Sequence, residues 1–113
     1  MTMLQKFCIG VAVALFPYGG AAASETGMAS RYSDLSVTAS GRKISAMDMV
    51  AAHRTLPLET RVKVESLATG KSVTVTIVDR GPFVKTRIID LSSGAADILG
   101  FVGLERVRLT VVQ

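Results

Sequence analysis

The fold is decided by the stretch Val78-Asp79-Arg80-Gly81-Pro82-Phe83 and the block Arg87-Ile88-Ile89-Asp90-Leu91-Ser92 that follows it. Apolar, β-branched residues precede Asp79 and surround Asp90, which is typical of short buried strands. The Gly-Pro pair is typical of a turn, because glycine tolerates a positive φ and proline fixes its own φ. The pattern therefore predicts two buried strands, each with an aspartate held at a rim and half exposed to water.

Two interpretations of these aspartates are open. Carboxylates at a partly desolvated rim can have raised or split pKa values, which acid/base chemistry on a sugar bond requires. Asp-Arg-Gly-Pro is also ordinary turn chemistry, in which the side chain of Asp79 bonds to its own backbone. On these residues alone the turn is the better interpretation.

The N-terminus predicts a secretory signal peptide, residues 1–23. Lys6 precedes an apolar stretch at residues 8–16, and the small residues Ala21-Ala22-Ala23 provide the cleavage site. The apolar stretch is too short for an ordinary membrane span, although an uncleaved anchor is the competing interpretation. The only cysteine, Cys8, lies inside this leader and is not placed for lipid attachment. We therefore expect a secreted or periplasmic protein of the cell envelope, with no stable membrane anchor after processing.

The expected mature chain, residues 24–113, has 90 residues and is one small domain. Without Lys6 it carries 12 Lys and Arg against 9 Asp and Glu, a net charge of +3 spread along the chain. A nucleic-acid surface usually clusters its cations among aromatic residues, so no nucleic-acid partner is expected. An anionic polymer such as a cell wall suits this mild charge. One histidine and no cysteine are too few ligands for a metal, and we expect a monomer without a cofactor.

Short strands at close spacing with a small helix predict a compact barrel. The expected strands are residues 27–32, 49–54, 61–67, 72–78, 88–91 and 107–112, the first two being the weaker candidates, with a hairpin turn at 68–71. Ser92 is the expected N-cap of a helix that runs to Leu99 and stops at Gly100. The residues expected to line one core are Val64, Val75, Ile77, Ile89 and Val111.

Five blocks resemble the rare lipoprotein A (RlpA) family, in the family's order, between residues 27 and 112. They are Gly27-Met28-Ala29-Ser30-x-Tyr32, Thr38-Ala39-Ser40-Gly41, Ala51-Ala52-His53-Arg54-Thr55-Leu56-Pro57-Leu58, Asp79-Arg80-Gly81-Pro82-Phe83 and Arg87-Ile88-Ile89-Asp90-Leu91-Ser92. The resemblance implies a six-stranded double-psi β-barrel with one or two short helices. It also implies endolytic lytic transglycosylase action on peptidoglycan glycan strands, in cell wall organization. Barwin and expansin domains of plants are more distantly similar and share the Asp-Leu-Ser block.

The resemblance also implies the site residues. It places Asp79, Asp90 and His53 in the catalytic groove, with Asp79 matching the family's acid and Asp90 the carboxylate of related barrels. One carboxyl group can serve first as acid and then as base, and the second can tune it through like-charge coupling. The residues expected to bind substrate are Tyr32, Arg42, Arg54 and Arg80. His53 has a competing interpretation, a structural imidazole bonded to a backbone carbonyl.

Two residues depart from the family pattern. Arg42 stands where the family has a glutamate implicated in activity, and a guanidinium cannot donate a proton at physiological pH. Arg31 stands where the family has a tryptophan that could stack on sugar. The alternatives to an enzyme are a catalytically weak or inactive barrel that binds peptidoglycan, and an expansin-like or protein-interaction module. The two aspartates and His53 favour the enzyme, whereas Arg42 favours the binding module.

Overall fold

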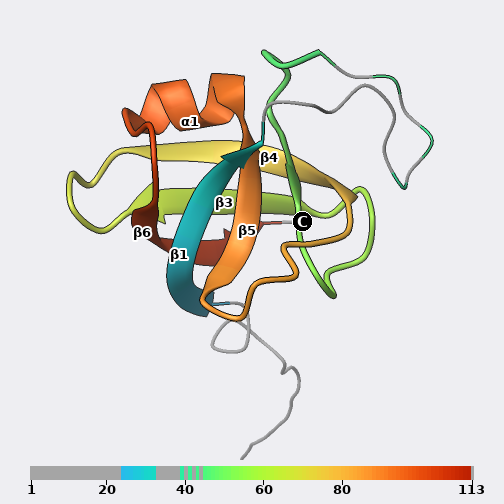
Figure 1. The fold of residues 1–113 in the computed structure, drawn as a ribbon, viewed down its shortest axis with the longest axis horizontal. Helices are drawn as coiled ribbons and strands as arrows, with labels where there is room; N and C mark the ends of the chain where they lie inside the picture. The colour runs from blue at the N-terminus through green and yellow to red at the C-terminus, as the bar shows by residue number, and fades with distance from the viewer. Residues whose placement is uncertain (1–23, 33–38, 40, 42, 44, 113) are drawn as a thin grey trace, which may run out of the picture.

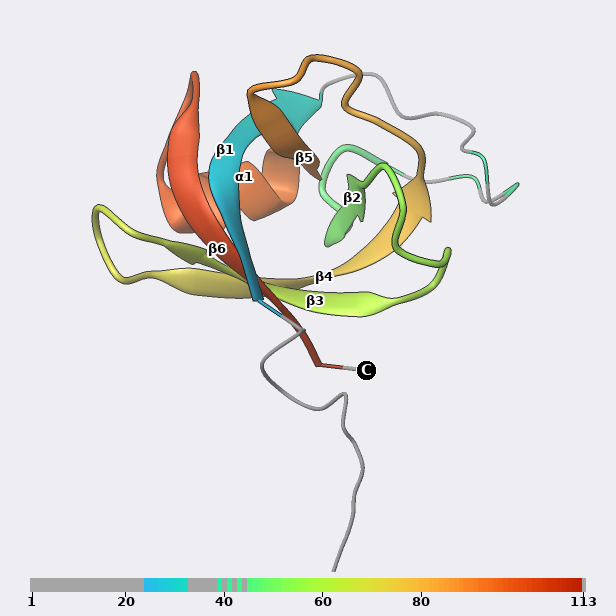
Figure 2. The ribbon, with the colours of Figure 1, turned by 90° about the horizontal axis from the view of Figure 1, so that it is seen from below.

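Alternating and β-branched sequences form six strands in the computed structural model, which describes residues 24–32, 39, 41, 43 and 45–112. In chain order the elements are β1 (Ser24–Tyr32), β2 (Val50–Ala52), β3 (Arg61–Ser66), β4 (Ser72–Asp79), β5 (Arg87–Ser92), α1 (Ser93–Leu99) and β6 (Glu105–Val111). The strands close into a barrel (Figure 1). Seen from below, they form a ring with α1 behind it (Figure 2). The helix therefore covers one end of the barrel.

The order of strands around the barrel is β1-β5-β2-β4-β3-β6. The pairs β1–β5 and β2–β4 are parallel, and the other pairs that have a register are antiparallel. Because β2 lies between β4 and β5, the two strands that carry the aspartates are separated by only one short strand. The six-stranded barrel expected from the sequence is confirmed.

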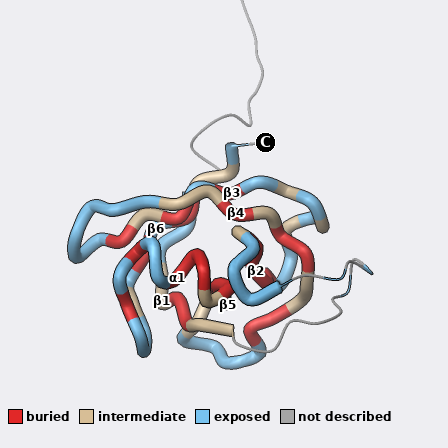
Figure 3. Tube along the Cα trace, turned by 90° about the horizontal axis from the view of Figure 1, so that it is seen from above, coloured by how far each residue is buried: buried red, intermediate tan, exposed pale blue. Residues whose placement is uncertain are grey.

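The barrel interior is filled by aliphatic side chains, to which every strand and α1 contribute. The largest of those that are fully buried are Val62, Val64, Val75, Ile77, Ile89, Leu91, Leu99, Val107 and Leu109. Buried positions recur around the whole ring (red in Figure 3). Burial of each such side chain contributes about 1.5–3 kcal/mol to folding. A cysteine-free domain of this size therefore depends on this one core.

The short helix α1 begins and ends where the sequence predicts. The hydroxyl of Ser92 accepts a hydrogen bond from the N–H of Ala95 at 3.2 Å, and Gly100 ends the helix with a φ of 87°. Gly94 lies so close to the chain that a Cβ there would be 2.6 Å from the carbonyl oxygen of Met47. A residue with a side chain would push the segment before β2 away from the helix.

The strand ends differ from the expected ones by up to three residues, and two differences bear on the site and the core. β2 is shorter than predicted, since it ends at Ala52, and His53 already belongs to the turn that follows. Val111 lies on the core face of β6 but is only half buried, because it is the last residue of the strand, whereas Val107 and Leu109 are buried. Residues 1–23, on which the signal-peptide prediction rests, lie outside the described residues.

Candidate active site

Asp79 and Asp90 lie on either side of the same residue, Ala52, in the barrel wall. Ala52 of β2 pairs with Asp79 of β4 on one side and with Asp90 of β5 on the other. Neighbouring strands are about 4.8 Å apart, so the backbones of the two aspartates are roughly 10 Å apart. Residues 51 and 91, one step along from Ala52 and Asp90, pair with each other and are fully buried in the core. Since side chains alternate between the faces of a sheet, Asp90 lies on the outer face.

An irregularity in β4 brings Asp79 to the same outer face. A strict period of two would place Ile77 and Asp79 on one face, and Ile77 is a fully buried core residue. The pairing with β2 skips Val78, so two residues of β4 follow Ile77 where β2 advances by one. Val78 packs against Tyr32 outside the main core, and Asp79 bonds to the same tyrosine. The bulge therefore directs the carboxylate of Asp79 outward.

Both carboxylate oxygens of Asp79 accept hydrogen bonds. Oδ2 accepts from the hydroxyl of Tyr32, and Oδ1 accepts from the backbone N–H of Ala39 at 3.0 Å and of Arg80 at 2.9 Å. Burial alone raises the pKa of Asp79, but these three hydrogen bonds and the charge of Arg80 outweigh it, so the pKa lies below the ordinary value of 3.8. The carboxylate of Asp79 is therefore charged at neutral pH.

Within the described part of the chain, Asp90 is held through one of its two oxygens. Oδ1 accepts a hydrogen bond from the hydroxyl of Ser30 and lies 3.3 Å from Nη2 of Arg87. Oδ2 carries neither contact and faces Gly81, since it lies 3.8 Å from the point that a Cβ on Gly81 would occupy. The side chain of Asp90 is 16% exposed. One oxygen is thus anchored, and the other points toward the segment that follows β4.

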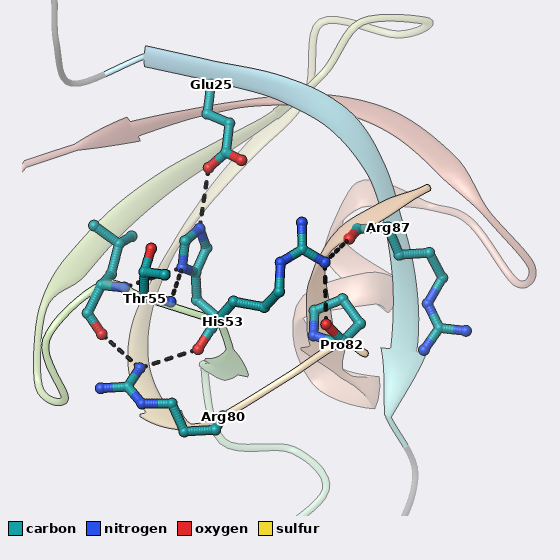
Figure 4. Close-up of polar contacts among 8 residues, drawn as sticks. Glu25, His53, Thr55, Arg80, Pro82 and Arg87 are labelled. Carbon is teal, nitrogen blue, oxygen red and sulfur yellow. Dashed lines mark hydrogen bonds and ion pairs between the residues drawn. The ribbon is translucent and has the colours of Figure 1, made fainter. Parts of the chain in front are cut away.

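His53 is held by the turn in which it lies (Figure 4). Its Nδ1 accepts hydrogen bonds from the backbone N–H groups of Thr55 and Leu56, each at 3.1 Å, and its Nε2 lies 3.0 Å from Oε1 of Glu25. Two donors at Nδ1 leave the proton on Nε2, which donates to Glu25. These contacts support the structural interpretation of the imidazole, with backbone N–H groups in place of the expected carbonyl. The catalytic role of His53 stays a prediction.

Arg54, predicted to bind substrate, forms hydrogen bonds to the backbone of the loop that follows β4. Its Nη1 donates to the carbonyl oxygens of Pro82 at 3.1 Å, Val84 at 3.4 Å and Arg87 at 2.8 Å. The contacts to Pro82 and Arg87 are drawn in Figure 4. One side chain from the turn after β2 therefore fixes the backbone of residues 82–87.

Arg80, also predicted to bind substrate, holds the turn after β2. Its Nη1 donates to the carbonyl oxygens of His53 at 3.0 Å and Leu56 at 2.7 Å (Figure 4). The backbone N–H of Arg80 bonds to Asp79, as described above. Arg80 thus connects the aspartate to the turn that contains the imidazole. Its role in substrate binding, like that of Arg54, stays a prediction.

The remaining sites of interest lie on β1 or outside the described residues. Tyr32, predicted to bind substrate, contacts Asp79 directly. Arg31 forms an ion pair with Asp97 of α1 at 3.0 Å and donates to the carbonyl oxygen of Phe101 at 2.9 Å. The side chain at position 31 therefore points to the helix rather than to Asp79 or Asp90. Arg42 lies outside the described residues.

The sequence reasoning missed Ser30 and Arg87, the two residues that hold Asp90. Ser30 could have been found, because it precedes Tyr32 by two positions in one strand and therefore shares its face. Arg87 could not, because an alternating strand would place residues 87 and 90 on opposite faces. The register of β5 shifts between Arg87 and Ile89, which brings Arg87 to the side of Asp90.

Two further properties concern the described residues alone. In that part of the chain no group of three or more His, Cys, Asp or Glu residues is arranged to hold a metal ion. Among the same residues, no helix has the length and apolar character needed to cross a membrane.

A protein-family model described as lytic transglycolase matches residues 24–111. The chain belongs to this family. A relative from Nostoc sp., named probable endolytic peptidoglycan transglycosylase RlpA, is 53% identical over an alignment of 77 residues that covers 66% of this chain and 21% of the relative. The endolytic peptidoglycan transglycosylase RlpA of Rickettsia typhi is 44% identical over an alignment of 101 residues that covers 82% of this chain and 32% of the relative. The chain thus spans about a fifth to a third of the length of these relatives.

The barrel also resembles a solved structure, the apo form of the expansin from Clavibacter michiganensis. The TM-score is 0.65 at 20% sequence identity, over 80% of this chain and 50% of the expansin chain. At this identity the likeness is one of fold alone. The double-psi β-barrel and the similarity to the RlpA family, both expected from the sequence, are confirmed.

Proposed function

We propose that this barrel is an endolytic peptidoglycan lytic transglycosylase, which cleaves glycan strands in cell wall organization and leaves 1,6-anhydro ends. The observation that carries the proposal is the placement of Asp79 and Asp90 on either side of Ala52, on the outer face of the barrel. Their surroundings differ in a way that suits two different roles. The curated relatives are named for this activity, which supports the same assignment.

The resemblance matches Asp79 to the family's acid, but the open oxygen of Asp90, which faces Gly81, favours Asp90 as the proton donor. Asp79 accepts three hydrogen bonds on its two oxygens and its pKa is lowered, so it stays charged and has no proton to give. Among the described residues, the partners of Asp90 contact Oδ1, which leaves Oδ2 to carry a proton toward a substrate over Gly81. Asp79 then serves as a fixed negative charge.

The reaction proceeds in two steps without water. Asp90 gives its proton to the glycosidic oxygen while the bond between that oxygen and C1 breaks. The oxygen of the same sugar's 6-hydroxyl then bonds to C1, and the hydroxyl proton passes to Asp90, which restores the acid. The charge of Asp79 stabilises the positive charge that develops on C1. Ser30 and Arg87 hold Oδ1 of Asp90 and thereby orient Oδ2.

A second candidate function is a barrel that binds peptidoglycan with little turnover. It is favoured by Arg42, since the family has a glutamate at that position and a guanidinium cannot exchange protons. On the enzyme proposal, Arg42→Glu raises the rate of anhydro-end formation, because it restores a group that can carry a proton. An unchanged rate in this variant would mean that Arg42 is not what limits turnover.

We further propose that the protein acts in the cell envelope as a monomer, after removal of residues 1–23. The charged start, apolar stretch and small residues of the leader support export, and peptidoglycan lies outside the cytoplasmic membrane. The closed barrel pairs every strand within the chain, which supports the monomer. The intact mass of protein from the native envelope tests export, and a mass that includes residues 1–23 would contradict it.

The enzyme proposal is tested by digesting glycan strands free of stem peptides and analysing the products by mass spectrometry. We expect 1,6-anhydro ends, and no heavy oxygen in the products when the digestion is run in water labelled with heavy oxygen. Incorporation of the label would show hydrolysis and contradict the mechanism. No product, together with sedimentation of the protein on glycan, would favour the second candidate.

A further inference from the structure

Phe83 is an exposed aromatic residue beside the open oxygen of Asp90. Its side chain is 84% exposed, although it lies in the loop directly after β4. Cε2 of its ring is 3.5 Å from the point that a Cβ on Gly81 would occupy, and Oδ2 of Asp90 is 3.8 Å from the same point. The ring and the carboxylate oxygen therefore flank one position, which glycine leaves without a side chain.

The backbone on both sides of Phe83 is fixed. Nη1 of Arg54 donates to the carbonyl oxygens of Pro82 and Val84, the two residues that flank it in the chain. The same atom also bonds to the carbonyl oxygen of Arg87, where β5 begins. Hydrogen bonds from a charged donor are the stronger kind, so the loop keeps its shape without a ligand. A ligand that contacts the ring has little backbone freedom left to remove.

Exposure alone does not mark a binding residue, because single exposed apolar side chains are common. Val102, in the segment between α1 and β6, is an example of such an exposed apolar residue, at 83% exposure. Phe83 differs in two respects. Its ring and Oδ2 of Asp90 both lie within 4 Å of the Cβ position of Gly81, and Arg54 holds the backbone on both sides of it.

We propose that Phe83 binds the glycan, with its ring stacked on the apolar C–H face of a sugar ring whose glycosidic bond lies at Asp90. The inference rests on the proposed function and names the contact that positions the substrate there. A pyranose has C–H groups on its faces and hydroxyl groups at its rim, so it pairs an aromatic surface with a carboxylate beside it. Arg54 acts in this arrangement as a positioning residue.

The test measures the glycan concentration that half-saturates the protein, and kcat, with glycan strands free of stem peptides. Phe83→Ala raises the half-saturating concentration about tenfold, the effect of losing one aromatic contact, and lowers kcat less. Phe83→Trp retains an aromatic ring and stays close to the wild type. Val102→Ala is the matched control, because it removes an equally exposed apolar side chain away from the aspartates. Thermal unfolding of each variant confirms that the fold is intact.

The outcomes separate this inference from the proposed function. If the wild type binds and cleaves glycan but Phe83→Ala is unchanged, or if Phe83→Ala and Val102→Ala weaken binding equally, the inference is wrong and the enzyme stands. If the wild type binds without cleaving, sedimentation on glycan replaces the kinetic assay, and the same comparison of variants decides. If the wild type neither binds nor cleaves, both proposals are overturned.

Discussion

Arg54 and Arg80 each bind the backbone of the segment that carries the other. Arg54, in the turn after β2, holds the carbonyl oxygens of three residues between positions 82 and 87. Arg80, at the start of that loop, holds the carbonyl oxygens of His53 and Leu56 in the turn after β2. The turn and the loop therefore form one unit beside Asp79 and Asp90, although they are more than 20 positions apart in the sequence.

The first prediction concerns Arg54 as a positioning residue. Arg54→Ala frees the backbone on both sides of Phe83, so we expect it to raise the half-saturating glycan concentration about as much as Phe83→Ala does. If Arg54 acts through Phe83, adding Arg54→Ala to Phe83→Ala changes little further, because the contact is already lost. Multiplicative effects in the double variant would mean that Arg54 acts independently, for instance by binding substrate itself.

The controls for this comparison of single and double variants distinguish a displaced loop from an unfolded barrel. Arg54→Lys keeps the charge but not the planar guanidinium, so it should restore binding only in part. Thermal unfolding of all four variants shows whether the loop alone or the whole barrel has changed. A loss of kcat without a change in half-saturation would contradict a positioning role.

The second prediction concerns pH. The pKa of Asp79 is lower in the folded chain than its ordinary value of 3.8, so ionised Asp79 stabilises the fold above that pH. The contribution is lost as the pH falls through the folded pKa. We expect Asp79→Asn to lower the free energy of unfolding most at neutral pH, and the difference from the wild type to shrink in acid below 3.8. Urea unfolding at several pH values measures this, and a difference independent of pH would show that the charge of Asp79 contributes nothing.

The third prediction concerns the core. Ile89 of β5 is fully buried in the barrel core, so Ile89→Ala should lower the free energy of unfolding by about 2–5 kcal/mol. Ile98 of α1 is 49% exposed, and Ile98→Ala serves as the control, with an expected change below about 1 kcal/mol. Chemical denaturation compares the two. Equal changes in the two variants would contradict the assignment of Ile89 to the core.

The period of two and the capping residues were enough to predict most of the fold. Alternation gave the faces of β3 and β4, and Ser92 and Gly100 gave both ends of α1. The double-psi β-barrel came only with the family resemblance, because local sequence does not determine which distant strands pair. The prediction made β2 too long because it included residues 53 and 54 in the strand. In the structure both lie in the turn after β2, where the carbonyl oxygen of His53 accepts from Arg80 and the side chain of Arg54 binds the next loop.

The site was predictable at the aspartates and less so around them. Both aspartates stand out because they occur at strand positions in specific blocks. Their partners depend on two bulges, one at Val78 and one between Arg87 and Ile89, which alter the faces that alternation would give. Gly27 shows how the second bulge is accommodated, since a Cβ there would lie 2.7 Å from the side chain of Ile88. Such close approaches cannot be inferred from a single sequence.

The central claim is that Asp90 gives the proton and Asp79 supplies a fixed charge, and rates of anhydro-end formation by three aspartate variants test it most directly. Asp90→Asn keeps an acceptor for Ser30 but has no acid proton, so the rate should fall at least about 100-fold with the fold intact. Asp79→Asn should lower the rate about 100-fold by removing the charge near C1. Asp97→Asn, the same change on the exposed face of α1, should leave the rate within about twofold of the wild type. Wild-type rates in Asp90→Asn would contradict the claim.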